Sequence, residues 1–204
     1  TGTRIAVRFF GGYNLSSIDL NSESLVSEAY QKGVTMGSDL LHDDNKIPEF
    51  LVWAQRDKNG APLQRIQIIK GWIDNNSGRP KEKVFDLACS DGMQPDSITN
   101  RCPDNGARVN INDCSISTNV GSSELKTVWK DPEFAPDDKV FYYVRVLENP
   151  TCRWSTWDAI KAGYKPREGL HETIQERAWS SPIWYIPEQS DVEVVPLGGT
   201  IQLR

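Results

Sequence analysis

Alternation of hydrophobic and polar residues predicts that most of this chain is β-strand. Residues 3–10 (TRIAVRFF) alternate in this way, and Gly11-Gly12 predicts a bend after them. Residues 139–147 (KVFYYVRVL) are the strongest strand candidate, because β-branched and aromatic residues dominate them. The other predicted strands span residues 48–56, 63–73, 83–88, 123–129 and 179–186. The last of these contains Pro182, which predicts a bent or edge strand.

Turn residues divide this pattern. Asp57-Lys58-Asn59-Gly60 carries the Asn-Gly signal of a β-hairpin, so we expect strands 48–56 and 63–73 to pair with each other. Within the second strand, Ile66, Ile68 and Trp72 are expected to share one face. Asn75-Asn76-Ser77-Gly78 predicts the next turn.

Two short helices interrupt the strands. The first is predicted to begin at a cap on Asn21 or Ser22 and to run to Lys32, with Gly33 in the C-terminal cap. The second is predicted over residues 156–162, between Ser155 as the N-cap and Gly163. With seven or eight strands at this spacing, the sequence predicts an all-β, Ig-like β-sandwich with two short helices and a disulfide-stapled loop.

Length and charge limit the classes of protein to which the chain can belong. All-β sandwiches reach 204 residues as one unit, so we expect a single domain over residues 1–187 and a C-terminal tail over 188–204, with a short strand at 200–203 (TIQL). No apolar run is long enough to span a membrane. The net charge of −5, with no Lys/Arg-rich stripe, argues against nucleic-acid binding. Thr1-Gly2-Thr3-Arg4 is neither an initiator start nor a signal peptide, so we expect a piece of a longer protein.

The four cysteines favour disulfides over zinc, because none lies at a C-x-x-C spacing. Three pairings are possible. The turn formers Asp91-Gly92 and Pro95-Asp96 favour Cys89–Cys102, which leaves Cys114–Cys152. Two disulfides would order the segment 90–119, which has little apolar periodicity, and would indicate an exported protein. The alternative is four reduced, buried thiols in a cytosolic protein.

No catalytic constellation is visible. The chain has two histidines, His42 and His171, and lacks the G-x-S-x-G, P-loop and G-x-G-x-x-G motifs. His42 stands beside Asp43 and Asp44, where a surface metal contact is conceivable, although a solvated turn is the favoured interpretation.

The cysteine-rich segment also carries oxygen side chains that suit Ca²⁺. These residues do not have EF-hand spacing, and turn formation is the alternative role for them. They are Asp91, Asp96, Asp104, Asn105 and Asp113.

Seven tryptophans allow two interpretations. Exposed tryptophans could stack on sugar rings, with Arg153 and Asp158 supplying hydrogen bonds. The favoured interpretation is packing, with some tryptophans in the core and the rest over one edge of the sandwich. Trp53, Trp72 and Trp129 are assigned to the core, and Trp154, Trp157, Trp179 and Trp184 to the edge.

Four motifs together resemble one family, the domain-of-unknown-function family 3604, which comprises bacterial, often exported proteins. The motifs are PLQRIQIIKGW (62–72), FYYVRVLENP (141–150), CRWSTWDA (152–159) and QERAWSSPIWY (175–185). A fifth, GVTMG at 33–37, resembles the family's G-V-P-M-G turn, with Thr35 in place of proline. The resemblance runs from Thr1 to about Pro187.

The resemblance implies a function for the longer protein. Family members resemble PHP-type metal-dependent hydrolases, whose N-terminal α/β barrel holds a divalent metal through His and Asp clusters that include a His-x-His element. Thr1 to Ile5 resembles the exit from that barrel, and no His-x-His or Asp-x-His occurs here, so no metal ligand carries over. The resemblance therefore implies a non-catalytic accessory β-sandwich with no cofactor of its own, whose partner is the N-terminal barrel.

Charged residues inside the aromatic motifs suggest where this domain docks. Arg153, Glu176 and Arg177 are costly to bury unpaired, so we expect them to be paired or to lie at an interface. With Trp154 and Trp157 they form the predicted surface for docking on, or gating, the barrel. The alternative is a carbohydrate- or surface-binding module using exposed tryptophans. A free-standing enzyme is disfavoured, because no catalytic constellation is visible.

Overall fold

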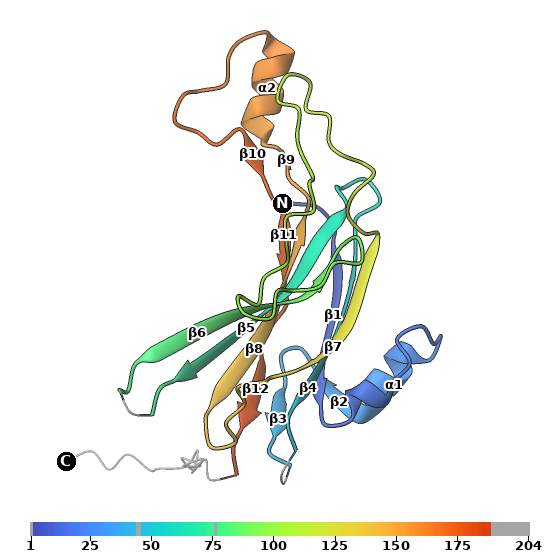
Figure 1. Ribbon diagram of the computed structural model, residues 1–204, viewed down its shortest axis with the longest axis vertical. Helices are drawn as coiled ribbons and strands as arrows, with labels where there is room; N and C mark the ends of the chain where they lie inside the picture. The colour runs from blue at the N-terminus through green and yellow to red at the C-terminus, as the bar shows by residue number, and fades with distance from the viewer. Residues whose placement is uncertain (1, 44–45, 76, 189–204) are drawn as a thin grey trace, which may run out of the picture.

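The structure is a computed structural model that describes residues 2–43, 46–75 and 77–188. Its described part is long and narrow and consists mainly of β-strands (Figure 1). The strands are β1 (Ala6–Gly12), β2 (Gly33–Thr35), β3 (Asp39–Leu41), β4 (Glu49–Gln55), β5 (Leu63–Ile73), β6 (Pro80–Cys89), β7 (Glu124–Lys130), β8 (Val140–Glu148), β9 (Thr151–Cys152), β10 (Thr173–Ile174), β11 (Arg177–Trp179) and β12 (Ile183–Ile186). The helices are α1 (Leu25–Lys32) and α2 (Trp154–Ala162), with one 3-10 turn at Leu15–Ser17.

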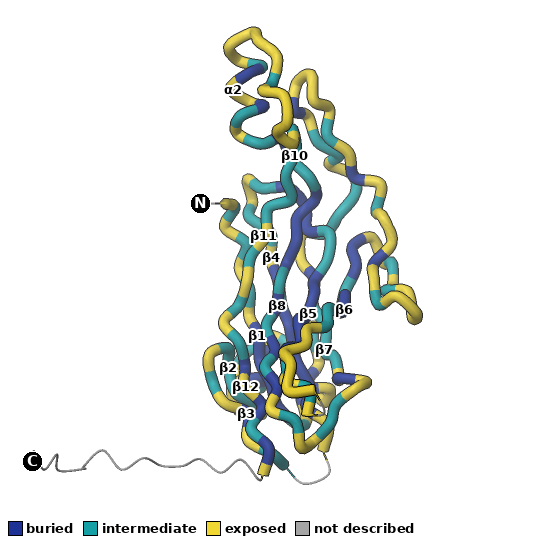
Figure 2. Tube along the Cα trace, turned by 90° about the vertical axis from the view of Figure 1, so that its left-hand side faces the viewer, coloured by how far each residue is buried: buried dark blue, intermediate teal, exposed yellow. Residues whose placement is uncertain are grey.

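Two sheets form the sandwich, which confirms the all-β fold. One has four strands in the order β2-β1-β4-β7, and the other has the order β3-β12-β8-β5-β6, with β11 also paired to β8. The core lies between them, where alternate residues of facing strands meet, as the period of two requires. Its largest fully buried side chains include Phe9, Phe50, Tyr142 and Tyr185. Figure 2 shows buried residues running along these strands.

Helix α1 covers part of the outer face of the four-stranded sheet, where its Leu25 and Ala29 join a second buried cluster with Phe10 and Leu51. The helix ends at Lys32 as predicted, but the prediction of a cap at Asn21 or Ser22 is wrong. Those two residues lie in turns anchored on Asp19, and the helix begins only at Leu25.

Gly33 is the C-cap of α1, as predicted, but it is extended and not in the left-handed conformation typical of a capping glycine. It opens β2 directly after the helix. A Cβ on Gly33 would lie 2.5 Å from the carbonyl oxygen of Gly11 in β1, so glycine is needed there for close approach of two strands. Gly11 and Gly12 likewise continue β1 and do not form the predicted bend.

The predicted hairpin between strands 48–56 and 63–73 is wrong. β4 pairs with β1 and β7 in one sheet, whereas β5 pairs with β6 and β8 in the other. The turn at 57–60, closed by a bond from the Gly60 amide to the Asp57 carbonyl, therefore carries the chain across the sandwich. β5 forms its hairpin with β6, the next strand along the chain. The turn predicted at 75–78 lies between them in the sequence, and residue 76 is outside the described residues.

Most other strand predictions are confirmed within a few residues. The 179–186 segment is bent at Pro182, as predicted: β11 and β12 lie on either side of it, and both pair with β8. Short strands that the sequence pattern did not reveal, β2, β3, β9 and β10, raise the number among the described residues to twelve. The predicted strand at 200–203 lies outside the described residues.

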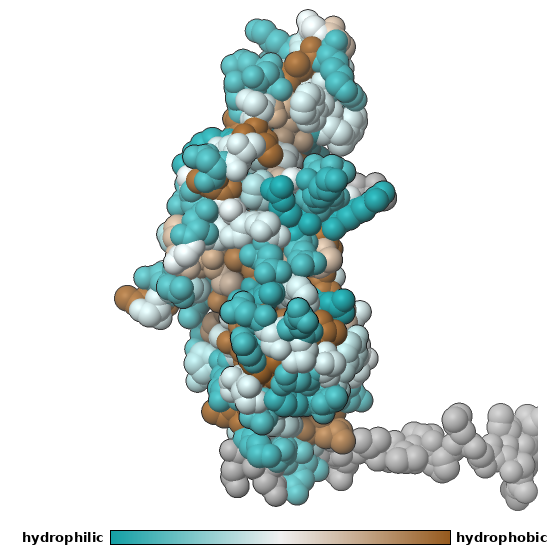
Figure 3. Space-filling view, turned by 90° about the vertical axis from the view of Figure 1, so that its right-hand side faces the viewer, coloured by the Kyte–Doolittle hydropathy of each residue, from teal (hydrophilic) through white to brown (hydrophobic). Residues whose placement is uncertain are grey.

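A second, smaller layer lies at one end of the sandwich (Figure 1). Here α2 and the short pair β9–β10 lie beside part of the irregular segment 90–122, whose first residues stay next to β6. The second helix ends at Gly163 in the left-handed conformation, as predicted, but it begins one residue after Arg153, so the predicted cap on Ser155 is wrong. Figure 3 shows hydrophobic residues only as small, separate areas on the face it presents.

Two disulfides, Cys89–Cys102 and Cys114–Cys152, hold this end together and confirm the favoured pairing. The first ties the end of β6 to the irregular segment, and the second ties that segment to β9. Disulfides of this kind fit an extracellular environment. No helix in the described ranges is long and apolar enough to cross a membrane.

Candidate functional site

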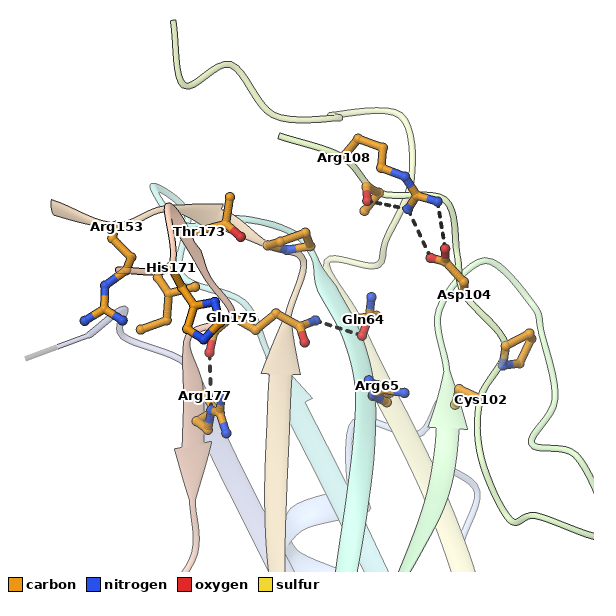
Figure 4. Close-up of a pocket in the computed structure, with 14 residues that line it drawn as sticks. Gln64, Arg65, Cys102, Asp104, Arg108, Arg153, His171, Thr173, Gln175 and Arg177 are labelled. Carbon is orange, nitrogen blue, oxygen red and sulfur yellow. Dashed lines mark hydrogen bonds and ion pairs between the residues drawn. The ribbon is translucent and has the colours of Figure 1, made fainter. Parts of the chain in front are cut away.

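A cleft of about 780 Å³ opens where the sandwich meets its disulfide-linked end. Four arginines line it, each from a different segment: Arg65 from β5, Arg108 from the irregular segment, Arg153 before α2 and Arg177 from β11. Figure 4 shows Arg153, His171 and Arg177 on one side of the cleft, and Arg65 and Arg108 on the other. We call this feature the arginine cleft.

Positive charge dominates the arginine cleft, although the chain as a whole is acidic. Asp104 is the one carboxylate among the described lining residues. The guanidinium of Arg108 donates two hydrogen bonds, of 2.8 and 3.3 Å, to the carboxylate of Asp104, and this contact lowers the pKa of the Asp104 carboxyl. Asp104 therefore stays ionised and neutralises Arg108, which leaves the other three guanidinium groups to define the charge of the cleft.

Among the described residues, Arg65 forms an ion pair with Asp86, which it shares with Arg101. Its Nη1 lies 3.4 Å from Oδ2 of Asp86, and Nη1 of Arg101 lies 3.4 Å from the other oxygen of the same carboxylate. Asp86 also accepts short bonds from the Cys102 amide and the Gln67 side chain. The Nε of Arg65 is buried and has no hydrogen-bond partner, so it is not the atom through which Arg65 would reach a ligand in the cleft.

The backbones of Arg153 and Arg177 are held by hydrogen bonds, but their guanidinium charges are not paired with a carboxylate among the described residues. The amide of Arg153 donates to the carbonyl of Glu172 at 2.9 Å, and its carbonyl accepts from the first turn of α2. Within the described part of the chain, neither guanidinium forms an ion pair. Arg177 donates from Nε to the carbonyl of Gln175 and lies 5.9 Å from the ring centroid of Trp179.

Side-chain amides connect the two sides of the cleft. Gln175 donates to the Gln64 side chain at 2.9 Å and to the carbonyl of Glu148 at 3.0 Å. Gln64 in turn donates to the side chain of Asn105. These bonds tie β5, the irregular segment and the chain before β11 together. They fix the positions of the segments that carry Arg65 and Arg177 (Figure 4).

The structure brings some of the predicted docking residues together. Arg153 and Arg177 line the same cleft, while Trp154 and Trp157 lie on α2 and are 74% and 41% exposed. Glu176 faces away toward the N-terminal segment: a Cβ on Gly2 would lie 2.7 Å from its Oε2. Their role in docking stays a prediction.

The tryptophans divide as the sequence suggested for the core but not for the edge. Trp72 and Trp129 pack against the core between the sheets, and Trp53 packs against the cluster under α1. The four assigned to an edge are substantially exposed, including Trp179 at 58% and Trp184 at 47%. They do not form one group: Trp154 and Trp157 lie on α2, and Trp179 and Trp184 lie on β11 and β12.

The two histidines lie in different surroundings in the structure. His171 is exposed and lines the arginine cleft. Nδ1 of His42 lies 2.8 Å from the hydroxyl of Tyr185, so the His42 ring is hydrogen-bonded within the protein. No group of three or more His, Cys, Asp or Glu side chains in the described ranges could hold a metal ion.

The candidate calcium ligands bond to other groups of the chain, some within turns and some across longer distances in the sequence. Asp96 accepts from the amides of Ile98 and Thr99, Asp113 from the amide of Ser115, and Asp91 from the amide of Gly121. Asn105 bonds to Asn149. With Asp104 paired to Arg108, each of the five has a partner from the chain itself, which is the alternative role considered for them.

Sequence reasoning missed Arg65, Arg108 and the position of His171 in the cleft. Arg65 occupies an ordinary outward-facing position of a strand, and Arg108 lies in a segment without periodicity. A signal was nevertheless present: Arg65, Arg153 and Arg177 all fall within the motifs that carry the family resemblance.

Comparison with protein families places the chain. The model described as "Protein of unknown function (DUF3604)" matches residues 1–187. The chain belongs to this family. The DUF3604 match covers every residue of the arginine cleft and ends just after β12. No curated protein and no solved structure shows significant similarity to the chain, so its fold and cleft are described from its own structure.

Proposed function

We propose that this DUF3604 chain is a non-catalytic accessory domain of an exported bacterial protein, and that it docks on, or gates, a PHP-type metal-dependent hydrolase barrel. The observation that carries the proposal is the arginine cleft, whose Arg65, Arg153 and Arg177 present guanidinium groups that no carboxylate of their own fully neutralises. Exposed cations held in a concave site attract and orient anionic groups.

The position of the cleft supports the barrel as the partner. Glu176, which neighbours Gly2, stands between two lining residues, Gln175 and Arg177. A domain joined ahead of residue 2 would therefore begin beside the strand that carries Arg177, on the face that Glu176 occupies. In the proposal its rim reaches round that strand to the cleft, where the guanidinium groups hold the anionic part of whatever the barrel acts on.

The metal of this proposal belongs to the barrel. The described residues of this chain do not fit a catalytic metal, because they include no cluster of three or more suitable side chains. Their contribution is binding and orientation, for which bidentate arginines suffice.

The test compares this chain with the longer natural protein that the proposal requires. We expect the longer protein to hydrolyse p-nitrophenyl phosphate with Mn²⁺ and to lose this activity on chelation, whereas this chain alone shows none. In the longer protein, Arg153→Glu combined with Arg177→Glu is expected to raise KM by about tenfold or more, with a smaller change in kcat. Metal-dependent turnover by this chain alone would contradict the proposal.

A second candidate, a carbohydrate- or surface-binding module, is favoured by aromatic side chains on the outer face of the larger sheet. The Phe141 and Trp184 rings lie 5.1 Å apart, and the Phe141 and Tyr143 rings are stacked at 6.3 Å. If this face binds neutral sugars, cello-oligosaccharides will change the tryptophan fluorescence, and Trp184→Ala will abolish the change. No change with any neutral sugar would eliminate this candidate.

A further inference from the structure

We propose that the arginine cleft binds an acidic oligosaccharide, a sugar chain that carries uronate carboxylates or sulfate groups. The inference deepens the proposed function, because it names the ligand class of the same site. It can be tested on this chain alone, without the barrel.

The charges indicate a ligand with several separated anionic groups. Arg153 and Arg177 lie on one side of the cleft and Arg65 on the other (Figure 4). One small anion cannot neutralise guanidinium groups on both sides of a cleft of about 780 Å³, a volume typical of sites for organic ligands. A chain with a negative group on each of several units can, because each planar guanidinium can form two parallel bonds with a carboxylate or sulfate.

Aromatic side chains beside these arginines favour a sugar chain. Trp179 is 58% exposed, and its ring lies 5.9 Å from the guanidinium of Arg177. Trp154, which follows Arg153 in the sequence and is 74% exposed, and Trp179 both lie outside the lining of the cleft, so they would contact the units of a sugar chain that extend beyond it. A sugar ring has an apolar face that can cover an exposed indole, while its acidic substituent reaches the neighbouring arginine.

The remaining lining residues supply groups for sugar hydroxyls. Gln64, Thr173 and Gln175 place amide and hydroxyl groups along the cleft, and the two glutamines are already held by bonds to each other. Both hydrogens of the Gln175 amide are already donated, to Gln64 and to the Glu148 carbonyl, so Gln175 offers a sugar hydroxyl its oxygen as an acceptor. The Thr173 hydroxyl can both accept and donate.

The test is calorimetric titration of the intact, disulfide-bonded chain. Trigalacturonate and a sulfated κ-carrageenan tetrasaccharide are the probes, and fully methyl-esterified trigalacturonate is the matched uncharged control. We expect at least one acidic probe to bind. If trigalacturonate binds, its methyl ester should bind at least about tenfold more weakly. For κ-carrageenan the neutral control is its desulfated tetrasaccharide.

Variants localise the binding. Arg153→Ala and Arg177→Ala are each expected to weaken it about tenfold, and Trp179→Ala severalfold. Arg79→Ala, an exposed arginine before β6 at the far end of the sandwich, is the control and should leave affinity unchanged. Because a variant that misfolds would also lose affinity, each is checked by its thermal unfolding midpoint. Arg177→Lys, which keeps the charge but loses the two-bond geometry, is tested in parallel and should bind at an intermediate level.

Four outcomes overturn the inference: no binding of either acidic probe, equal binding of the neutral controls, equal loss in Arg79→Ala, or tighter binding of inorganic sulfate or of poly-glutamate at the same ionic strength. The last would identify a simple anion or an acidic peptide as the ligand. The two proposals can fail separately. If no sugar binds, but Arg153→Glu with Arg177→Glu in the longer protein still raises the KM for its substrate, the proposed function is supported and the acidic oligosaccharide is rejected as the ligand.

Discussion

Lys70 and Asp131 form an ion pair of 2.6 Å in the interior of the sandwich, where their side chains are 3% and 0% exposed. Lys70 lies on β5 of the larger sheet, and Asp131 directly follows β7 of the smaller one. Asp131 also accepts a bond of 2.7 Å from the hydroxyl of Tyr142, and Lys70 donates to the carbonyl of Glu133. The pair therefore joins the two sheets through groups that have almost no contact with water.

Removing one partner of this pair should be far more costly than removing both. Lys70→Met leaves the Asp131 carboxylate buried without its cation, and we expect the free energy of unfolding to fall by about 3–5 kcal/mol. Lys70→Met combined with Asp131→Leu should lose less, because no buried charge remains. Guanidinium chloride denaturation measures both, and equal losses in the single and the double variant would contradict the assignment.

Glu148 predicts a pH dependence of stability. Its side chain is buried beneath Gly60. Burial, with a smaller contribution from Glu176, raises the pKa of this carboxyl in the folded protein. The folded state then holds the proton more tightly than the unfolded state, so stability falls as pH rises from the ordinary glutamate pKa to the raised value.

Glu148→Gln removes that dependence. We expect the variant to be more stable than the native chain at pH 7–8, by about 1–3 kcal/mol, and to show no advantage at pH 4 and below, where the native carboxyl is protonated in both states. Denaturation at a series of pH values provides the measurement, and the exposed Glu82→Gln is the matched control. An advantage of the same size at pH 4 and pH 8 would show that the effect is not one of charge.

Gly71 and Phe141 form a cross-strand pair in which the ring covers the glycine. A Cβ on Gly71 would lie 2.2 Å from Cζ of Phe141. Gly71→Ala should therefore cost about 1–3 kcal/mol by displacing the ring. Combined with Phe141→Leu it should cost less than the sum of the two single changes, and full additivity in this double-mutant cycle would argue against the contact.

The Cys114–Cys152 disulfide should order the cleft as well as stabilise the fold. Cys152 directly precedes Arg153, and Cys114 lies in the segment that carries Arg108. Replacing both cysteines by serine is expected to lower the free energy of unfolding by about 2–4 kcal/mol. It should also speed amide hydrogen exchange in residues 151–174 while leaving β4 unchanged. Uniform acceleration across both sheets would contradict this local role.

The sequence predicted the elements of this fold better than their partners. The strand at 63–73 was placed to the residue, because its apolar residues alternate between two turn signals. The partner of that strand was wrong, since Asn59-Gly60 specifies only that the chain turns. Which sheet each strand joins depends on packing among Phe9, Phe50 and Tyr142, whose segments lie far apart in the chain.

The site was predictable in part for a similar reason. The sequence predicts a role for Arg153 and Arg177, because a charged residue within an aromatic motif needs a partner or an interface. Arg65 gave no such signal, because a polar residue is expected at every outward-facing position of a strand. Four segments converge on the cleft, and no spacing along the chain reveals that convergence.

The central claim is that the arginine cleft, and not the general surface, is where this domain binds its ligand. The most direct measurement takes the acidic oligosaccharide that the native chain binds most tightly and compares its affinity for two variants in which the same number of charges is reversed. Arg153→Glu with Arg177→Glu reverses two cleft charges, and Lys58→Glu with Arg79→Glu reverses two exposed charges elsewhere. We predict that the first variant loses at least about a hundredfold in affinity and that the second stays within about twofold of the native chain. Equal losses in both would contradict the account.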